Sequence, residues 1–529
     1  MKNRNKYKGE KLDFVLQLLD DKQVSITEAC QLMCKEFGIE YHENVRKGVS
    51  RLVNEQGRGN KKKIEDTKDF KKAKKRKFDK EKKTFIITYA QNATPVHKKL
   101  WENIKAYTEH LGANLHVIAG RYKNPTSTWS GKQNSNEWWD SEVSEYLDAN
   151  RHNIHKHLQV LSDVKVSPTA SNPLSGLNGM TGLESCIIGH PRQHLKSLPI
   201  LEGYPHKLLL STGACTKSNY TDSKSGKKGE FHHMYGFVIV ELDGEHFHIR
   251  QVNADDKGNF YDLFKRVKNG NVMENKKGCE AAVLGDIHIQ HNDNVATDIS
   301  FGLLDVMKPK HTMIHDIIDC ESISHWDSLN PFRMMKKEEE GTDNLYQEIR
   351  DMIQWTKDRL KYNLVVVRSN HDDFLDRWLQ RSDWRKCGNR KLYLEAANIL
   401  ANKNVAQKKG VIPYYLESEF GDKIKTLGLD DSYRVLGWEL GMHGHIGANG
   451  SRGGANQFKA MNTKTITGHT HQPTKIDGHM SVGTLTHLRV GYNRGLSSWM
   501  QTNILIYPDG KAQHIHIVNN KYCRNMPND

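Results

Sequence analysis

The sequence predicts an α/β protein built from several parts. Three observations support this prediction: the length of 529 residues, a lysine-rich stretch that separates a helical start from the rest, and apolar runs of strand length that end in polar loops. Because so long a chain exceeds one compact core, roughly two to four domains are expected. Changes in composition place the parts at residues 1–58, 59–83, 84–275 and 276–529.

The first part is predicted to form three short helices. Leu12, Val15 and Leu19 recur at helical spacing, and the third predicted helix also carries Arg46 and Arg51. A helix, a short turn and a basic helix resemble a helix-turn-helix module. Two interpretations stay open for it: contact with DNA, or a packing role that includes assembly into a homo-oligomer.

Residues 59–83 are crowded with lysine and contain almost no apolar side chains. Such a segment cannot bury a core, so we expect a solvated linker or a charged helix. It would follow a phosphate backbone without reading sequence, or serve as a spacer that aids solubility. The formal net charge of the chain is +15, which favours a polyanionic partner, and we expect that partner to be DNA.

The central part, residues 84–275, is expected to be an α/β or α+β domain of unknown role. Strands are predicted at 85–89 and 115–119, with a helix over 95–112 between them. Asp243-Gly244 predicts a later hairpin. Polar clusters such as the one from His190 to His194 match no mechanism and are interpreted as structural. No repeat of fixed period is visible.

The eight cysteines are scattered and form no C-x-x-C pair, which argues against a zinc ribbon or a redox pair. Reduced thiols fit a cytoplasmic protein. The chain starts without an apolar signal segment and contains no long apolar run. We therefore expect a cytoplasmic localisation and no membrane partner.

From about residue 278, five apolar segments end in short polar loops. The loops are Gly285-Asp286-Ile287-His288, His315-Asp316, Ser369-Asn370-His371-Asp372, Met442-His443-Gly444-His445 and Gly468-His469-Thr470-His471. Loops that follow buried strands lie along one edge of a sheet, so these five are expected to converge. Their carboxylates, imidazoles and amide oxygen, without a thiolate, suit manganese, iron or zinc. A carboxylate that shares its oxygens can hold two ions ~3.5–4 Å apart, as in hydrolytic two-metal sites.

In this order the loops resemble the signature of the calcineurin-like metallophosphoesterase superfamily, which includes the SbcD-type nucleases. That signature is D-x-H, G-D-x-x-D, G-N-H-[DE], a histidine often followed by glycine, and G-H-x-H, and the resemblance covers roughly residues 278–520. It implies an α/β fold whose C-terminal part is a four-layer metallophosphoesterase β-sandwich flanked by helices. The central domain and the small N-terminal helical module would precede that part.

The resemblance also implies roles for individual residues. The first ion would be bound by Asp286, His288 and His471, and the second by Asn370, His443 and His469. Asp316 would bridge both ions, and His371 would act as an acid on the leaving oxygen without binding metal. His445 and Arg452 are candidate substrate contacts, each with an equally good structural interpretation. Two positions depart from the signature, because His315 and Ser369 stand where glycine is usual.

The implied cofactors are two divalent ions, Mn²⁺ first, with Mg²⁺, Fe²⁺ or Zn²⁺ as alternatives. The implied reaction is phosphodiester hydrolysis by a water or hydroxide shared between the ions. The order of parts also resembles phage-encoded members implicated in degrading host DNA, which predicts a DNase of the host cytoplasm. Two alternatives remain: a phosphatase or phosphodiesterase for another phosphoester, and a DNA-binding regulator with an incidental metal site.

Overall fold

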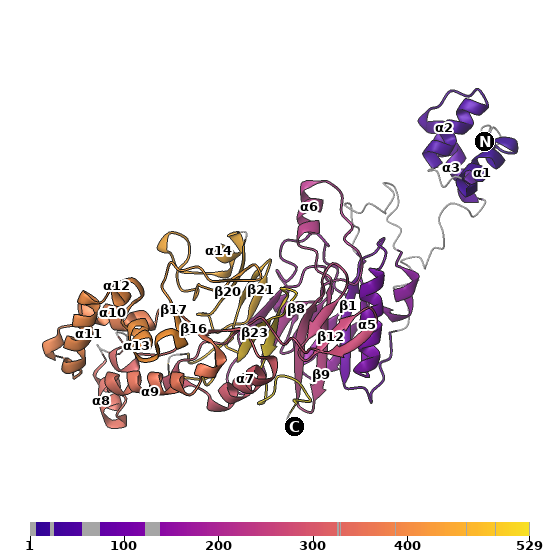
Figure 1. Ribbon diagram of the computed structural model, residues 1–529. Helices are drawn as coiled ribbons and strands as arrows, with labels where there is room; N and C mark the ends of the chain where they lie inside the picture. Colours follow the sequence, from indigo (N-terminus) through magenta and orange to yellow (C-terminus); the bar gives the residue numbers. More distant parts are fainter. Residues whose placement is uncertain are drawn as a thin grey trace. The chain divides into compact units, whose positions relative to one another are not determined.

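The computed structural model describes residues 7–21, 26–55, 75–121, 138–324, 327, 330–386, 388–461, 463–491 and 493–527. The chain forms two compact units, Met1–Phe70 and Lys71–Asp529, and each is described by itself (Figure 1). Within the described ranges, no helix has both the length and the apolar character needed to cross a membrane.

The first unit contains the three helices that the apolar spacing predicts. They are α1 (Glu10–Asp21), α2 (Ile26–Glu36) and α3 (Glu43–Glu55). Their apolar faces meet in one small core that buries Val15, Met33 and Val49. The role of this unit in binding DNA stays a prediction.

The lysine-rich segment, residues 59–83, is described from residue 75 onward. Residues 56–74 lie outside the described ranges, but residues 75–83 pack against the rest of the second unit. The Arg76 amide donates a hydrogen bond to Asp148 (3.0 Å), and the Phe78 ring packs edge-on against Phe85. The expectation of a solvated segment is therefore wrong for these residues, because one aromatic ring and the backbone anchor a stretch whose lysines stay outside.

A six-stranded sheet carries the first polar loops. Its order is β17-β16-β15-β14-β23-β24, with the first four strands parallel and the last two antiparallel. The bounds are β14 (Ala281–Val283), β15 (His311–His315), β16 (Leu364–Val367), β17 (Lys425–Leu427), β23 (Thr502–Ile506) and β24 (Ala512–His516).

Helices cover one face of this sheet and bury its apolar side chains (Figure 1). They are α7 (Asn294–Met307), α9 (Leu345–Lys357), α10 (Asp372–Arg381), α11 (Arg390–Asn402), α12 (Asn404–Lys409) and α13 (Val411–Phe420), with α8 (Pro331–Glu340) preceding α9. Parallel strands alternating with helices bring successive strand ends to one sheet edge, and this places the loops side by side.

A ten-stranded sheet packs on the other face, with Val283, Val367, Trp438 and Ile466 in the shared core. Its order is β18-β19-β20-β22-β21-β7-β8-β6-β5-β4. The bounds are β18 (Arg434–Val435), β19 (Trp438–Glu439), β20 (Lys464–Thr467), β21 (Thr474–Ile476), β22 (His479–Ser481), β4 (Arg151–His155), β5 (Leu158–Leu161), β6 (Ser185–Ile188), β7 (Leu195–Leu198) and β8 (Lys207–Ser211), and α14 (Ala455–Ala460) precedes β20.

A five-stranded sheet, β10-β9-β1-β2-β3, packs against the β4–β8 half of the long sheet. Its bounds are β1 (Thr84–Ala90), β2 (Asn114–Ala119), β3 (Leu147–Asp148), β9 (Gly236–Asp243) and β10 (His246–Asn253), and α5 (Lys98–His110) joins β1 to β2. The central part adds α6 (Lys224–Phe231) and a small sheet of β11 (Phe260–Asp262), β12 (Lys265–Lys268) and β13 (Asn271–Glu274). The β-α-β start and the Asp243-Gly244 hairpin are thus present as predicted.

The boundary expected near residue 276 does not separate two compact units. The long sheet runs across it, because β7 of the central part pairs directly with β21 of the C-terminal part. The central and C-terminal parts therefore share the ten-stranded sheet. The sequence could not show this pairing, since the two strands lie far apart along the chain.

The two halves of the second unit repeat one strand topology. In the C-terminal half, β14 pairs in parallel with β15 and antiparallel with β23, and β23 forms a hairpin with β24. In the central half, β1, β2, β9 and β10 pair in the same way. The order β4-β5-β6-β8-β7 likewise matches β18-β19-β20-β22-β21 in its parallel and antiparallel pairings. We call this the topological repeat.

Two glycines, one in each half, also occupy equivalent places in the topological repeat, and each lies close to a side chain from a neighbouring strand end. A Cβ atom at Gly468 would lie 2.1 Å from Asp286 Oδ1, and a Cβ atom at Gly189 would lie 2.6 Å from Tyr89 Cδ2. Tyr89 thus stands where the C-terminal half has a candidate metal ligand. The central half repeats the architecture without that carboxylate.

Candidate metal centre

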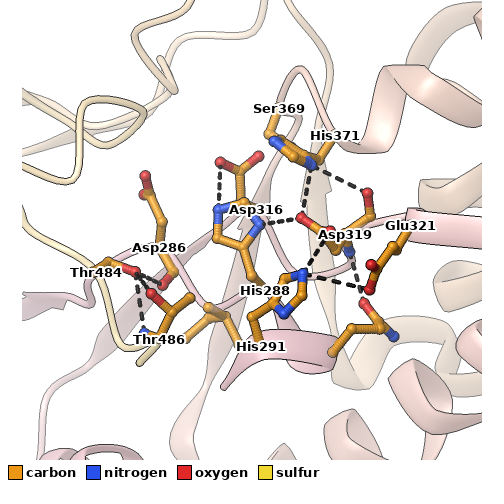
Figure 2. A network of polar contacts seen from close by, with 12 residues as sticks. Asp286, His288, His291, Asp316, Asp319, Glu321, Ser369, His371, Thr484 and Thr486 are labelled. Atoms are coloured by element: carbon orange, nitrogen blue, oxygen red, sulfur yellow. Dashed lines mark hydrogen bonds and ion pairs between the residues drawn. The ribbon is translucent and has the colours of Figure 1, made fainter. Parts of the chain in front are cut away.

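All seven candidate ligands lie together at one edge of the paired sheets. Each follows a strand end: Asp286 and His288 follow β14, Asp316 follows β15, Asn370 follows β16, His443 follows β19, and His469 and His471 follow β20. The convergence expected from the sequence is present in the structure. Figure 2 shows several of these side chains pointing toward one another.

One group of side chains is fully buried and tightly spaced. Potential ligand atoms of Asp286, His288, Asp316 and His471 all lie within 4.8 Å of one another. His288 Nε2 lies 3.1 Å from His471 Nε2, and His471 Nε2 lies 3.1 Å from Asp286 Oδ2. These are the donors that the sequence assigns to the first ion.

A second group lies beside the first. His443 Nε2 is 3.0 Å from Asn370 Oδ1, and His469 Nδ1 is 2.9 Å from the same oxygen. This group contains the donors assigned to the second ion. A hydrogen bond fixes the backbone of the Asn370 loop, because the Arg377 guanidinium donates to the Asn370 carbonyl oxygen (2.7 Å).

Asp316 joins the two groups. Its Oδ2 lies 3.3 Å from His288 Nε2 and 3.2 Å from His443 Nε2. Burial by itself would raise the pKa of Asp316, but the neighbouring histidines, His443 first, hold that pKa well below its ordinary value. A buried carboxylate between two imidazole groups is the placement that a bridging ligand requires.

The backbone at the site adopts conformations that sequence patterns do not reveal. His288, Asp316, His469 and His471 all have positive φ angles, of 45°, 44°, 72° and 56°. Such angles are uncommon for residues other than glycine and cluster at functional sites, where the surrounding structure enforces them. They turn each side chain out of its strand direction and into the centre.

Steric constraints explain why glycine stands at position 468 in the last loop. A Cβ atom at Gly468 would lie 2.1 Å from Asp286 Oδ1, so any side chain there would collide with that carboxylate. The His469 amide then donates a hydrogen bond to Asp286 Oδ2 (2.7 Å). Gly468 thus lets one loop lie directly against a ligand of another.

Asp319 orients two histidines at once. Its Oδ1 accepts from His288 Nδ1 (2.8 Å) and lies 3.0 Å from His371 Nδ1, as the dashed lines in Figure 2 show. Burial would raise the pKa of Asp319, yet His371 and the other adjacent histidines hold it well below its ordinary value. A carboxylate in this position fixes the protonated ring nitrogen, so that His288 Nε2 presents a lone pair to the centre.

His371 does not join either ligand group. Its Nδ1 faces the Asp319 carboxylate and carbonyl oxygens, and its ring lies edge-on to His288 with 4.6 Å between centroids. With Nδ1 engaged, the remaining ring nitrogen is the one free to meet a substrate. This geometry suits the acid role that the resemblance implies.

Three residues near the centre, His291, Glu321 and Trp499, were not identified as site residues from the sequence. His291 Nε2 lies 3.3 Å from Asp319 Oδ2 and 3.4 Å from Glu321, which extends the network of Figure 2. The Trp499 ring packs edge-on against His471, with 4.1 Å between centroids. No motif marks these positions, since their contacts arise from separate loops.

The two departures from the signature have local explanations. Ser369 and Asp372 bond to each other just before α10, because each backbone amide donates to the other's side chain (3.1 and 3.2 Å). His315 Nδ1 lies 3.4 Å from His443 Nδ1, behind a candidate ligand. Neither residue displaces any of the seven.

The two candidate substrate contacts, His445 and Arg452, differ in their burial. His445 is largely buried beside His443 and His469, and burial, followed by His443, lowers its pKa to about 3. A neutral imidazole is therefore expected there at neutral pH. Arg452 is exposed on a short loop closed by pairing with Ile446. Its role stays a prediction.

The residues present fit a pair of divalent cations. Asp286 Oδ1 and Asp316 Oδ1 are buried and accept no hydrogen bond within the described structure. Buried carboxylate oxygens without donors are costly, and a cation beside them removes that cost. Oxygen and imidazole donors without thiolate suit manganese, iron or zinc rather than a structural zinc site.

Comparison with known proteins gives three findings. No model of a protein family matches the sequence. The crystal structure of Vps29 from Chaetomium thermophilum matches 34% of this chain and 94% of its own, with 9% identity and a TM-score of 0.20, which is too low to support a conclusion. Protein A1 of Escherichia phage T5 is 32% identical over 464 residues, which cover 84% of this chain and 83% of the phage protein. The chain therefore belongs to the same family as Protein A1 of Escherichia phage T5.

Proposed function

We propose that this protein is a metal-dependent phosphodiesterase that cleaves DNA with two divalent ions, Mn²⁺ first. The observation that carries the proposal is the placement of Asp316, buried between the donors of the first group and those of the second. An arrangement with one shared carboxylate serves hydrolytic two-metal chemistry. A DNA-binding regulator would not need such a set of donors.

Each side chain would have a defined task. Asp286, His288 and His471 would hold one ion, Asn370, His443 and His469 the other, and Asp316 both. The ions would supply an activated water and neutralise charge on the phosphate. His371, oriented by Asp319 through Nδ1, would donate a proton from Nε2 to the departing oxygen.

DNA is the favoured substrate for two reasons. The net charge of +15 and the lysine-rich segment suit a polyanion. The relative also comes from a bacteriophage, so a phage-encoded enzyme that degrades host DNA in the host cytoplasm is consistent with the family. Hydrolysis of another phosphoester is the alternative that the next experiment separates.

The proposal is tested with purified full-length protein on linear and on closed circular DNA. We expect cleavage with Mn²⁺, slower cleavage with Mg²⁺, and none with chelator, because the buried donors need a cation to organise the reaction. Cleavage of circular DNA would identify an endonuclease. If neither DNA is cleaved while a small chromogenic phosphodiester is hydrolysed, DNA is the wrong substrate.

Deletion of residues 1–70 should weaken DNA affinity and flatten its dependence on salt. The deletion removes the helical unit and leaves the docked residues 75–83 in place, so the second unit keeps its packing. Each lost phosphate contact reduces the slope of log K against log salt by about 0.9 for duplex DNA. An unchanged slope would show that this unit makes no contact with phosphates.

A further inference from the structure

An arginine on the helix that follows His371 lies at the edge of the metal centre. Arg377 belongs to α10, and its half-buried side chain turns back toward the start of that helix. Its Nη2 donates a hydrogen bond to the Asn370 carbonyl oxygen (2.7 Å), and its Nε donates to the Asp373 carbonyl oxygen (3.3 Å). The guanidinium is therefore fixed beside the loop that supplies a candidate ligand of the second ion.

Aromatic packing restricts this guanidinium further. The Arg377 Cζ lies 4.8 Å from the centroid of the Phe374 ring, and that ring packs against the His371 ring with 4.6 Å between centroids. Residues three apart on a helix share one face, so the three side chains follow one another along α10. A guanidinium held between a ring and the backbone loses little further side-chain entropy when a ligand binds.

The positive charge of Arg377 is not neutralised by the part of the chain that the structure describes. Both of its hydrogen bonds go to backbone carbonyl oxygens, which carry no net charge. The nearby Asp373 carboxylate pairs with Arg368 instead (2.6 Å). The two bonds use two of the five N–H groups of a guanidinium and leave both N–H groups of Nη1 available. Arg377 thus keeps its charge and a donor for an anion.

A second polar group that lacks a partner also lies at Asp373. His445 is 13% exposed, and both of its ring nitrogens are buried without a hydrogen bond in the described structure. Its Nε2 lies 3.9 Å from Asp373 Oδ2, which is beyond hydrogen-bond reach. The ring centroids of His443 and His469 lie 5.3 and 6.0 Å from that of His445. A buried N–H group without an acceptor is costly, so a ligand that accepts from it would be stabilised.

A phosphate group has the chemistry that both side chains lack. Its oxygens accept hydrogen bonds from a guanidinium and from an imidazole N–H, and its negative charge compensates the arginine. His445 adjoins two candidate ligands of the second ion, and Arg377 bonds to the backbone of Asn370, which is another. A phosphate held by these two side chains would therefore lie on the second ion's side of the centre.

We propose that Arg377, together with His445, binds a phosphate group of the substrate next to the position of the second ion. The inference rests on the proposed function and adds a substrate-binding residue to it. Because Arg377 would hold the phosphate before and during the reaction, its loss should raise KM more than it lowers kcat.

The test measures the affinity of the full-length protein, loaded with Mn²⁺, for inorganic phosphate by isothermal titration calorimetry. Arg377→Gln should weaken this affinity about 10-fold, because a charge-assisted hydrogen bond is lost. KM for linear DNA should rise by a similar factor. Manganese content should stay at the wild-type level, since all seven candidate ligands remain. Arg377→Lys, which keeps the charge but not the planar fork, should give a smaller loss.

A matched control lies on the same helix. Arg381 is exposed in the last turn of α10, about one turn beyond Arg377. Arg381→Gln removes the same charge from the same helix without touching the Asn370 loop. It should bind inorganic phosphate and cleave DNA as the wild-type protein does, and an equal loss in this variant would show a general charge effect and overturn the inference.

The remaining outcomes separate the inference from the proposed function. Wild-type phosphate affinity in Arg377→Gln would overturn the inference while DNA cleavage keeps the proposed function. Loss of manganese, or a lower kcat at unchanged KM, would also overturn it, because Arg377 would then only support the Asn370 loop. Thermal unfolding identifies a variant that fails to fold, and Arg377→Lys then decides. Phosphate binding that depends on Arg377, in a protein that hydrolyses no phosphodiester with Mn²⁺, would keep the phosphate site and end the proposed function.

Discussion

Replacing Asp316 with alanine is expected to lower kcat/KM for metal-dependent hydrolysis by about 10³-fold or more. Asp316 Oδ2 lies near both His288 and His443, so loss of this side chain affects both ion positions together. The measurement is cleavage of linear DNA at saturating Mn²⁺, together with the manganese content of the purified variant. His443→Ala should behave similarly.

A matched control lies at the other end of β20. Asp477 is also a buried carboxylate with several basic neighbours, since Arg192, His194 and Lys459 lie within 2.9 to 3.2 Å. Asp477→Asn should lower thermal stability but leave manganese content and activity per folded molecule unchanged. Full activity in Asp316→Asn, which preserves the shape of the side chain, would contradict the assignment of the site.

The second large effect is expected for His371→Ala, which should keep its metal and lose rate by about 10²–10⁴-fold. His371 is not among the seven candidate ligands described above, and its Nδ1 faces the Asp319 carboxylate, so its removal should spare ion binding. Comparing a substrate with a poor leaving group and one with a good leaving group measures the effect. The loss should be much smaller for the good leaving group, which departs without a proton.

The leaving-group comparison also separates catalysis from structure. A merely structural role for His371 would lower both rates equally. Loss of manganese from the variant would show instead that His371 is a ligand, and the assignment of roles around Asp319 would then be wrong.

Several parts of the site could be predicted from the sequence because their signals are local. Asp286 with His288, and His469 with His471, stand two residues apart in the loops that follow β14 and β20. Parallel strands align their ends, so the convergence of the loops follows from the alternation of strands and helices. The three N-terminal helices were predictable for the same reason, from spacing within each helix.

Other features depend on contacts that no local pattern encodes. The docking of residues 75–83 rests on Phe78, one aromatic ring among lysines, finding Phe85 on a distant strand. Trp499 reaches His471 from another loop. The positive φ of Asp316 is imposed by the packing around it, because an aspartate alone does not favour that angle.

The sequence by itself indicated the candidate donor set, the order of its loops and the α/β character of the C-terminal half. Only the tertiary structure decided that the central half repeats the same strand topology, joins the long sheet through β7 and β21, and pairs Ile200 of its β7–β8 connection with Ser497. The physical reason is that strand pairing depends on backbone hydrogen bonds between distant segments. Those bonds are compatible with many side chains, so a shared architecture persists where shared residues such as Asp286 and Tyr89 do not.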